Sequence, residues 1–198
     1  MRNVDMPLFN RLLRLSDTFT FVKRSFYHFL FALYLGFCLP VSHSVAMADS
    51  IIEYQVKAAF IYNFIAFTHW PDNTSQTINL CVYGEDYFGK EIDKLESRSI
   101  NKRHIKVTRI DDIEKLKVCQ VIFFSKSVSS HLSSILSELQ NEPILTLADS
   151  PNATAQGIAI NMSLINEKIV FEINLARARR SGLDISSKLL QLAVKVHQ

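Results

Sequence analysis

Hydrophobic residues recur along this chain with two different spacings, which separate expected helices from expected strands. Between residues 51 and 67 apolar side chains return every three or four positions without Gly or Pro, a pattern that predicts an amphipathic helix. Shorter helices are expected at 88–95 and 174–180, and longer ones at 129–140 and 185–196.

Six further segments are continuously apolar or alternate between apolar and polar residues, as strands do. These segments are 78–83, 105–110, 118–124, 143–147, 157–163 and 168–173. Several of them are apolar on both faces, which is typical of strands that are covered on both sides. The order of the elements therefore predicts an α/β fold, with one domain whose mixed β-sheet of about six strands is flanked by helices.

An apolar run near the N-terminus has the features of an export signal. Residues 26–39 are apolar, follow Lys23 and Arg24, and precede the triplet Ala46-Met47-Ala48. A basic segment, an apolar segment and an A-x-A site predict a signal peptide over residues 1–48 that is cleaved after export. The exported domain would then span residues 49–198. The alternatives are an uncleaved anchor or a true start codon further downstream.

The charge of the chain is concentrated in this N-terminal segment. The formal net charge is +3, and residues 49–198 contain 17 basic and 17 acidic residues. A neutral domain lacks the basic face with which proteins displace counterions from nucleic acids. The sequence therefore argues against a nucleic acid as partner.

Export also changes the interpretation of the cysteines. Only Cys81 and Cys119 remain beyond residue 48, and an even number in an oxidising compartment favours a disulfide. Such a bridge would close a loop of about 39 residues, worth roughly 4 kcal/mol in the loop-entropy treatment. Two buried free thiols are the alternative. Two sulfurs without paired histidines cannot complete a zinc shell, so we expect no metal site.

The sequence contains no motif that predicts catalysis. It lacks the glycine-rich phosphate loops, the G-x-S-x-G turn and the H-E-x-x-H pattern. Ser125 and Ser127 follow an expected strand, where a polar strand exit explains them most simply. We expect no catalytic residue and no cofactor, and thiol chemistry at Cys81 or Cys119 is the enzymatic alternative.

Two segments contain candidate binding residues. His69 and Trp70 follow an aromatic helix and predict either core packing or a ring-lined pocket or docking surface. Glu172 lies inside an apolar strand, ahead of Arg177 and Arg180. A buried carboxylate usually has a partner, which a nearby arginine would supply. The alternative for these charges is an edge that binds a partner protein.

Five segments of the chain, in order, resemble those of YfiR-like periplasmic proteins. Residues 57–71 form the aromatic helix and its end, and residues 80–89 form a strand with its loop. Residues 119–125 are a cysteine with the strand after it, and 171–175 and 181–190 are two C-terminal segments. The resemblance covers essentially all of residues 49–198.

The resemblance implies a non-enzymatic periplasmic protein, with a homodimer as its assembly. It implies repression of an inner-membrane diguanylate cyclase through the periplasmic sensor domain of that enzyme, and relief by an OmpA-like outer-membrane lipoprotein. It also implies a Cys81–Cys119 disulfide and adds Asp184 and Ser186 to the candidate binding residues. The second cysteine pair of the best-known members has no counterpart at 149–161.

The sequence thus predicts a periplasmic repressor of a membrane signalling enzyme, either a diguanylate cyclase or a sensor kinase. The alternative is a periplasmic small-molecule-binding module that serves a sensor kinase or a transport system. In that case the region of His69 and Trp70 would form the ligand pocket.

Overall fold

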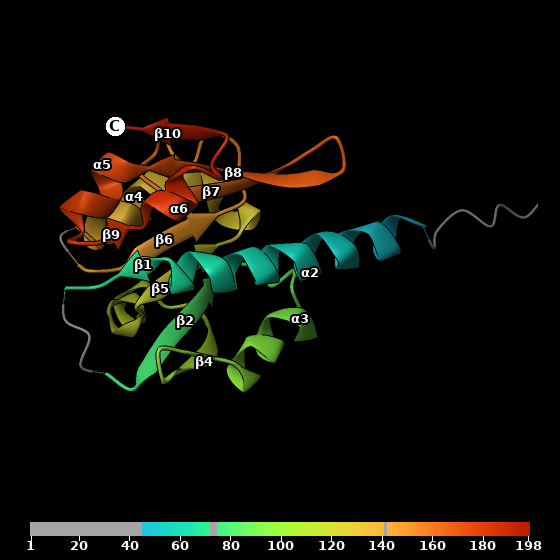
Figure 1. Cartoon of the computed structure of the whole chain (residues 1–198). Helices are drawn as coiled ribbons and strands as arrows, with labels where there is room; N and C mark the ends of the chain where they lie inside the picture. The colour runs from blue at the N-terminus through green and yellow to red at the C-terminus, as the bar shows by residue number, and fades with distance from the viewer. Residues whose placement is uncertain (1–44, 72–74, 141) are drawn as a thin grey trace, which may run out of the picture. The chain divides into compact units, whose positions relative to one another are not determined.

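The computed structural model describes residues 45–71, 75–140 and 142–198 (Figure 1). Almost all of the predicted signal peptide lies outside the described residues, and its expected cleavage site falls in the first turn of helix α2 (Val45–Ala66). No helix in the described part of the chain combines the length and the apolar character needed to cross a bilayer.

Eight strands form one mixed sheet, in the order β10-β8-β7-β6-β5-β2-β4-β3, and two others form a small ribbon, β1-β9. In chain order the strands are β1 (Thr68–His69), β2 (Thr77–Tyr83), β3 (Ser99–Ile100), β4 (Arg103–Ile110), β5 (Val121–Phe124), β6 (Leu145–Ala148), β7 (Ile160–Ile165), β8 (Lys168–Asn174), β9 (Asp184–Ile185) and β10 (Lys195–His197).

The helices after α2 are short. They are α3 (Lys90–Asp93), α4 (Leu132–Glu138), α5 (Leu175–Arg180) and α6 (Ser187–Leu190), with 3-10 turns η1 (Lys94–Ser97), η2 (Ile113–Val118) and η3 (Lys126–His131). The expected helix at 88–95 is therefore α3 followed by η1, and the expected helix at 129–140 is the end of η3 followed by α4.

The α/β class and the mixed sheet are confirmed. Neighbouring strands from β4 through β2, β5 and β6 to β7 run parallel, while β7 and β8 form an antiparallel hairpin. The sheet has eight strands instead of about six because β3 and β10, of two and three residues, complete its edges. Strands this short carry too few residues for an alternating pattern to predict them.

Alternate residues of the central strands face two separate cores. Val121 and Phe123 of β5 pack with α2, while Ile122 and Phe124 pack with α4. Helix α2 crosses one face of the sheet in Figure 1. The result is a three-layer arrangement, in which helices cover both faces of a sheet that is apolar on both sides.

The prediction of a helix over 185–196 is wrong. Only Ser187–Leu190 is helical, because Asp184–Ile185 pairs with β1 and Lys195–His197 pairs in parallel with β8. The apolar residues Leu192 and Val194, which lie within the predicted helix, are 68% and 61% exposed. Pairing with strands distant in sequence has overridden the local helical pattern.

The β7–β8 hairpin extends beyond the sheet. Strand β6 pairs only with Ile160 and Asn161 of β7, and β10 pairs only with the last three residues of β8. The outer part of the hairpin, residues 162–171, projects alongside the first half of α2 (Figure 1). One hairpin thus contributes both to the core and to the surface.

Candidate functional site

The β1–β9 ribbon brings together four of the predicted binding residues. His69 lies opposite Asp184 across the antiparallel pair, and both side chains are exposed. Trp70 follows His69, and the backbone N–H of Ser186 donates to the carbonyl of Phe67 at 2.9 Å. These residues, separated by more than a hundred positions in sequence, therefore share one small surface.

Among the described residues, the space that His69 and Trp70 line together is too small for a small-molecule ligand. The space that both residues line holds about 20 Å³, roughly the room for one water molecule. Trp70 also lines a second hollow of about 220 Å³ with Lys117 and Glu142, in which His69 takes no part. The Arg103 guanidinium lies 6.0 Å from the Trp70 ring. The Trp70 side chain is partly buried and packs against the core on the α2 side of the sheet.

Glu172 has a different partner from the one expected. Its carboxylate accepts from His197 Nε2 at 2.9 Å and from Thr154 Oγ1 at 3.2 Å, and its side chain is 36% exposed. The hydrogen bond from His197 lowers the pKa of Glu172 below its usual range. The expectation of a buried carboxylate paired with an arginine is wrong, because β10 brings His197 beside β8.

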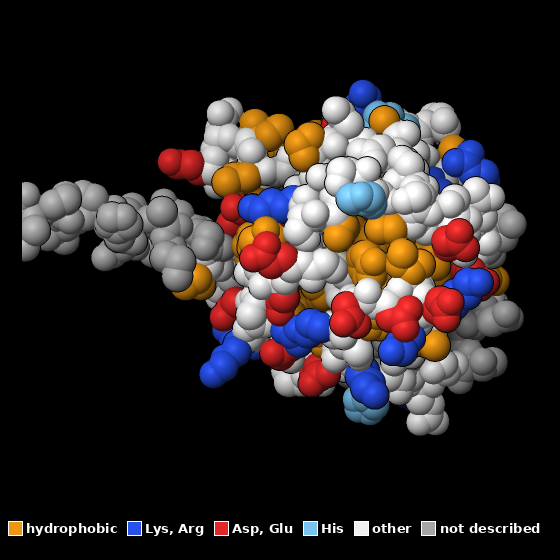
Figure 2. Space-filling view, turned by 180° about the vertical axis from the view of Figure 1, so that it is seen from behind, with side chains coloured by type: hydrophobic (Ala, Val, Ile, Leu, Met, Phe, Trp, Pro, Cys, Tyr) orange, Lys and Arg blue, Asp and Glu red, His pale blue; other side chains and the backbone are white. Residues whose placement is uncertain are grey.

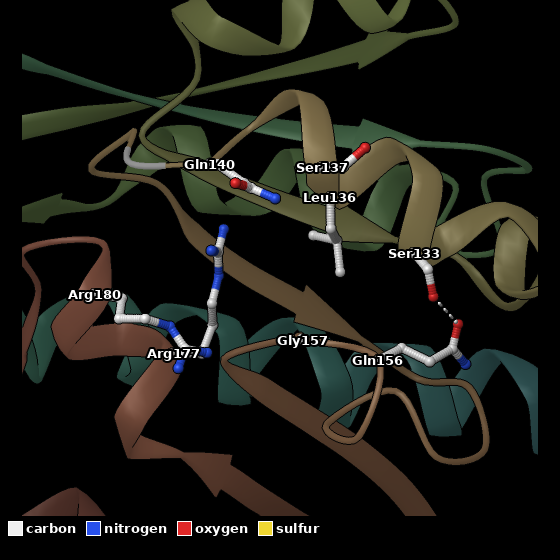
Figure 3. A pocket seen from close by; sticks show the side chains of 8 residues that line it. All are labelled: Ser133, Leu136, Ser137, Gln140, Gln156, Gly157, Arg177 and Arg180. Carbon is white, nitrogen blue, oxygen red and sulfur yellow. Dashed lines mark hydrogen bonds between the residues drawn. The ribbon is translucent and has the colours of Figure 1, made fainter.

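Arg177 and Arg180 line a pocket of about 340 Å³ that does not include Glu172 (Figure 3). Its other lining residues come from α4 and the chain just after it, and from the turn before β7: Ser133, Leu136, Ser137, Gln140, Gln156 and Gly157. We call this site the arginine pocket. Both arginines were predicted as binding residues, but not in this setting.

Cys81 and Cys119 form the predicted disulfide. The two sulfurs are 1.97 Å apart, the Cα atoms are 6.0 Å apart, and both residues are buried in the α4-side core. Cys119 ends η2, two residues before β5, so the bridge ties β2 to the entry of its neighbouring strand.

A buried charged cluster joins α2 to the end of β6. Asp149 Oδ2 accepts from the Tyr54 hydroxyl at 2.7 Å and from Lys57 Nζ at 2.6 Å, and Oδ1 accepts from the backbone N–H of Lys126 at 3.1 Å. Lys57 also pairs with Glu53 one helical turn away. We call Glu53, Tyr54, Lys57 and Asp149 the interior cluster.

The interior cluster was not predicted from the sequence. The side chains of Lys57 and Asp149 are only 3% and 1% exposed, so each charge is neutralised inside the protein. Burial and the hydrogen bond to Asp149 raise the pKa of the Tyr54 phenol. The available signal was a lysine on an apolar helix, four residues after a glutamate, but its carboxylate partner is 92 residues away.

The serines after β5 serve the structure. Strands β2 and β5 are parallel neighbours, and the order in which the strands follow one another reverses between them. The carboxyl ends of two such strands are a place where α/β folds often bind ligands. Here Ser127 Oγ accepts from the backbone N–H of Glu85 at 2.9 Å and lies 2.7 Å from Ser125 Oγ. A side chain at Gly84 would meet Ser127 Oγ at 2.7 Å. The loop after β2 and the loop after β5 are therefore packed directly against each other.

A large hollow lies between α2 and the β7–β8 hairpin. It holds about 720 Å³ and has apolar walls with a charged rim: Ile52, Val56, Phe60, Leu164 and Ile169 with Glu53, Glu167 and Lys168. We call it the apolar groove. Figure 2 shows apolar side chains gathered over the hairpin at the upper left.

The apolar groove was also missed from the sequence. Ile52 and Leu164 are 59% and 52% exposed, and the neighbouring Ile165 is 53% exposed. For the aromatic helix the sequence predicted either core packing or a pocket or docking surface near His69 and Trp70, but not a groove against the segment after 157–163. Helix α2 in fact buries one side, including Ile61 and Phe64, and presents apolar residues on another.

Two solved structures resemble the fold at low sequence identity. One is titled "Crystal structure of conserved domain protein from vibrio cholerae o1 biovar eltor str. n16961", with 7% identity and a TM-score of 0.49. The other is titled "The Crystal Structure of the ABC domain in complex with L-Trp from Streptococcus pneumonia to 1.35A", with 10% identity and a TM-score of 0.48. Each match covers 72% of this chain and 60% of the other.

A family model identifies the chain more directly. The model described as YfiR/HmsC-like matches residues 54–194. The match runs from α2 to the segment before β10 and includes both cysteines, the β1–β9 ribbon and both arginines. This chain belongs to the YfiR/HmsC-like family.

Proposed function

We propose that this protein is a non-enzymatic periplasmic regulator, which binds and represses the periplasmic sensor domain of an inner-membrane diguanylate cyclase. Family membership supports the regulatory class. The observation that carries the proposal is the apolar groove, because exposed apolar surface rimmed by charge is typical of protein–protein interfaces.

The groove is suited to an apolar face of the sensor domain. Its walls belong to two different elements, a long helix and a projecting hairpin, and its charged groups lie at the rim. Most of the outer edge of β8 is also left without a strand beside it, since β10 pairs only with Glu172–Asn174. An apolar helix or strand of the partner would bury this surface, with polar contacts around it.

Repression then follows from differential binding. A regulator that binds one conformation of the sensor domain more tightly shifts its equilibrium by the difference in binding free energy. Removal of the regulator by another envelope protein, such as an OmpA-like lipoprotein, would restore the active conformation. No chemical step by the regulator is needed.

The proposal is tested by placing a charge in the groove. Leu164→Asp should weaken capture of the sensor domain by about tenfold or more, because burial of one leucine contributes roughly 1.5–3 kcal/mol. The matched control is Leu192→Asp, since Leu192 is 68% exposed and does not line the groove. Equal capture of both variants and of the original chain would contradict the assignment of this surface.

The cellular test addresses the cyclase itself. Deletion of the gene should raise cyclic-di-GMP and biofilm formation, and the Leu192→Asp protein should restore repression while Leu164→Asp should not. An unchanged cyclic-di-GMP level after deletion would count against the cyclase and favour a sensor kinase as the target. Sedimentation of both variants shows whether a second copy of the chain, the expected homodimer, uses the same groove.

A further inference from the structure

The arginine pocket leads to an inference that stands independently of the partner proposed above. The pocket lies between α4 and α5, with the turn before β7 along one side (Figure 3). Its volume of about 340 Å³ is far larger than one water molecule and suits a small solute.

The pocket contains positive charge that the surrounding side chains leave unbalanced. Arg177 and Arg180 both line it, and no acidic residue is among the described residues that do. No ion pair to either guanidinium is found in the described part of the chain. Burial, followed by the nearby positive charge of Arg180, lowers the pKa of Arg177.

Two of the lining side chains have N–H groups that their own hydrogen bonds leave unused. In Figure 3 the Arg177 guanidinium points from α5 toward Gln140. One of its nitrogens reaches the Leu139 carbonyl at a long 3.4 Å, which leaves the other N–H groups for a ligand. The Gln156 carbonyl accepts from Ser133 at 3.4 Å, so the amide nitrogen of Gln156 is the group left to donate.

Other lining residues restrict what can bind. The Ser137 hydroxyl donates to the Ser134 carbonyl at 2.6 Å and is therefore already used. Leu136 gives one wall an apolar surface, as its side chain points into the space in Figure 3. A ligand would meet cationic donors on the α5 side and a small apolar surface on the α4 side.

We infer that the arginine pocket binds a small doubly charged oxyanion, with Arg177 and Arg180 as its charge-assisted hydrogen-bond donors. A guanidinium presents a planar fork that matches carboxylate and phosphate oxygens. Two guanidiniums that line one pocket favour a dianion over a monoanion, because the second negative charge offsets the second cation. Phosphate and dicarboxylate share this chemistry, and the volume leaves room for a few carbon atoms.

A simpler role for these arginines makes a different prediction. Arg177, Arg179 and Arg180 all lie in the last turn of α5, where basic residues interact favourably with the helix dipole. Arg179 is exposed and does not line the pocket. If the helix end alone explained the arginines, all three would respond alike to substitution.

The test is a titration of the protein purified from the periplasm, at constant ionic strength. Inorganic phosphate and succinate are the dianion probes and acetate is the monoanion control, with binding followed by calorimetry and by backbone amide shifts in NMR spectra. We expect saturable binding of at least one dianion, with shifts at Gln156, Gly157 and Gln140, and much weaker binding of acetate. Whichever of phosphate and succinate binds more tightly identifies the source of the charge.

Substitutions then locate the site. Arg180→Gln and Arg177→Gln should each weaken dianion binding by about tenfold or more, while Arg179→Gln should change it less than twofold. Since Arg180 is exposed, its variant provides the test even where Arg177→Gln disturbs folding. Absence of saturable dianion binding to the original chain, equal binding of acetate, or an equal loss in Arg179→Gln would each overturn the inference.

Discussion

The interior cluster and the arginine pocket place basic side chains on helices beside the same sheet, but with opposite outcomes. Lys57 lies between two carboxylates, Asp149 and Glu53, and is 3% exposed. Arg177 shares its pocket with a second cation, Arg180, and no carboxylate is among the described residues that line it. A charge satisfied within the fold holds elements together, whereas a charge left unbalanced at a pocket is available to a ligand.

Among the interactions compared here, the disulfide should make the largest single contribution to stability. The double substitution Cys81→Ser with Cys119→Ser should lower the free energy of unfolding by about 4 kcal/mol, through the loop-entropy effect of its 38-residue separation. Urea unfolding with and without reductant measures it. If the double variant is still about as much less stable than the original chain after the original chain has been reduced, lost packing and not the bridge is responsible.

Opening the interior cluster should cost slightly less. Lys57→Met removes the cation and leaves the Asp149 carboxylate buried with only the Tyr54 hydroxyl and the Lys126 N–H as donors. Loss of one partner of a buried ion pair costs about 3 kcal/mol. Chemical unfolding at neutral pH measures the change, and the double variant Lys57→Met with Asp149→Leu should recover part of it.

The arginines of the pocket should affect stability much less than Lys57. Arg177→Gln and Arg180→Gln should each change the free energy of unfolding by about 1 kcal/mol or less, since neither removes an ion pair. The same unfolding assay measures this change. A loss of stability as large as that of Lys57→Met would contradict the proposed difference between the arginine pocket and the interior cluster.

The Glu172–His197 pair is paired like the interior cluster but partly exposed like the arginine pocket. Its loss should have the smallest effect on the free energy of unfolding. Its side chains are 36% and 32% exposed, so Glu172→Gln should cost about 0.5 kcal/mol at pH 6. The hydrogen bond from His197 lowers the pKa of folded Glu172, so this contribution is present above the unfolded pKa and is lost as pH falls through the folded pKa.

The matching measurement is unfolding of both proteins between about pH 6 and pH 3, the range in which a glutamate titrates. The difference between the original chain and Glu172→Gln should disappear toward the acidic end. A difference that stays constant across this range would show that the carboxylate charge is not responsible.

The predictable parts of the fold are those with a long local pattern. The strands at 78–83 and 168–173 were found within one residue, because each has a continuous run of strand-forming residues. The helix at 51–67 was also found, although it begins earlier, at Val45. The C-terminal helix failed because β8 supplies backbone pairing to 195–197 that no local pattern reveals. The same pairing carries His197 to Glu172, so the error in secondary structure caused the error in the partner of Glu172.

The candidate sites divide in a similar way. Cys81, Cys119, Arg177 and Arg180 were identified as residues of interest, and the cysteines also as a pair. Neither the apolar groove nor the arginine pocket was foreseen, since each is lined by residues from separate segments of the chain. His69 and Trp70 illustrate the reverse case, in which a suggestive local motif encloses only about 20 Å³.

The sequence by itself determined the α/β class, the disulfide partners and the family of this protein, because these depend on periodicity, on cysteine number and on the order of short motifs. Only the tertiary structure decided which charges are neutralised and which remain available. That distinction rests on distances between segments far apart in the chain, such as the 92 residues between Lys57 and Asp149. Burial fixes the energetic consequence of each charge, and burial is a property of the folded chain.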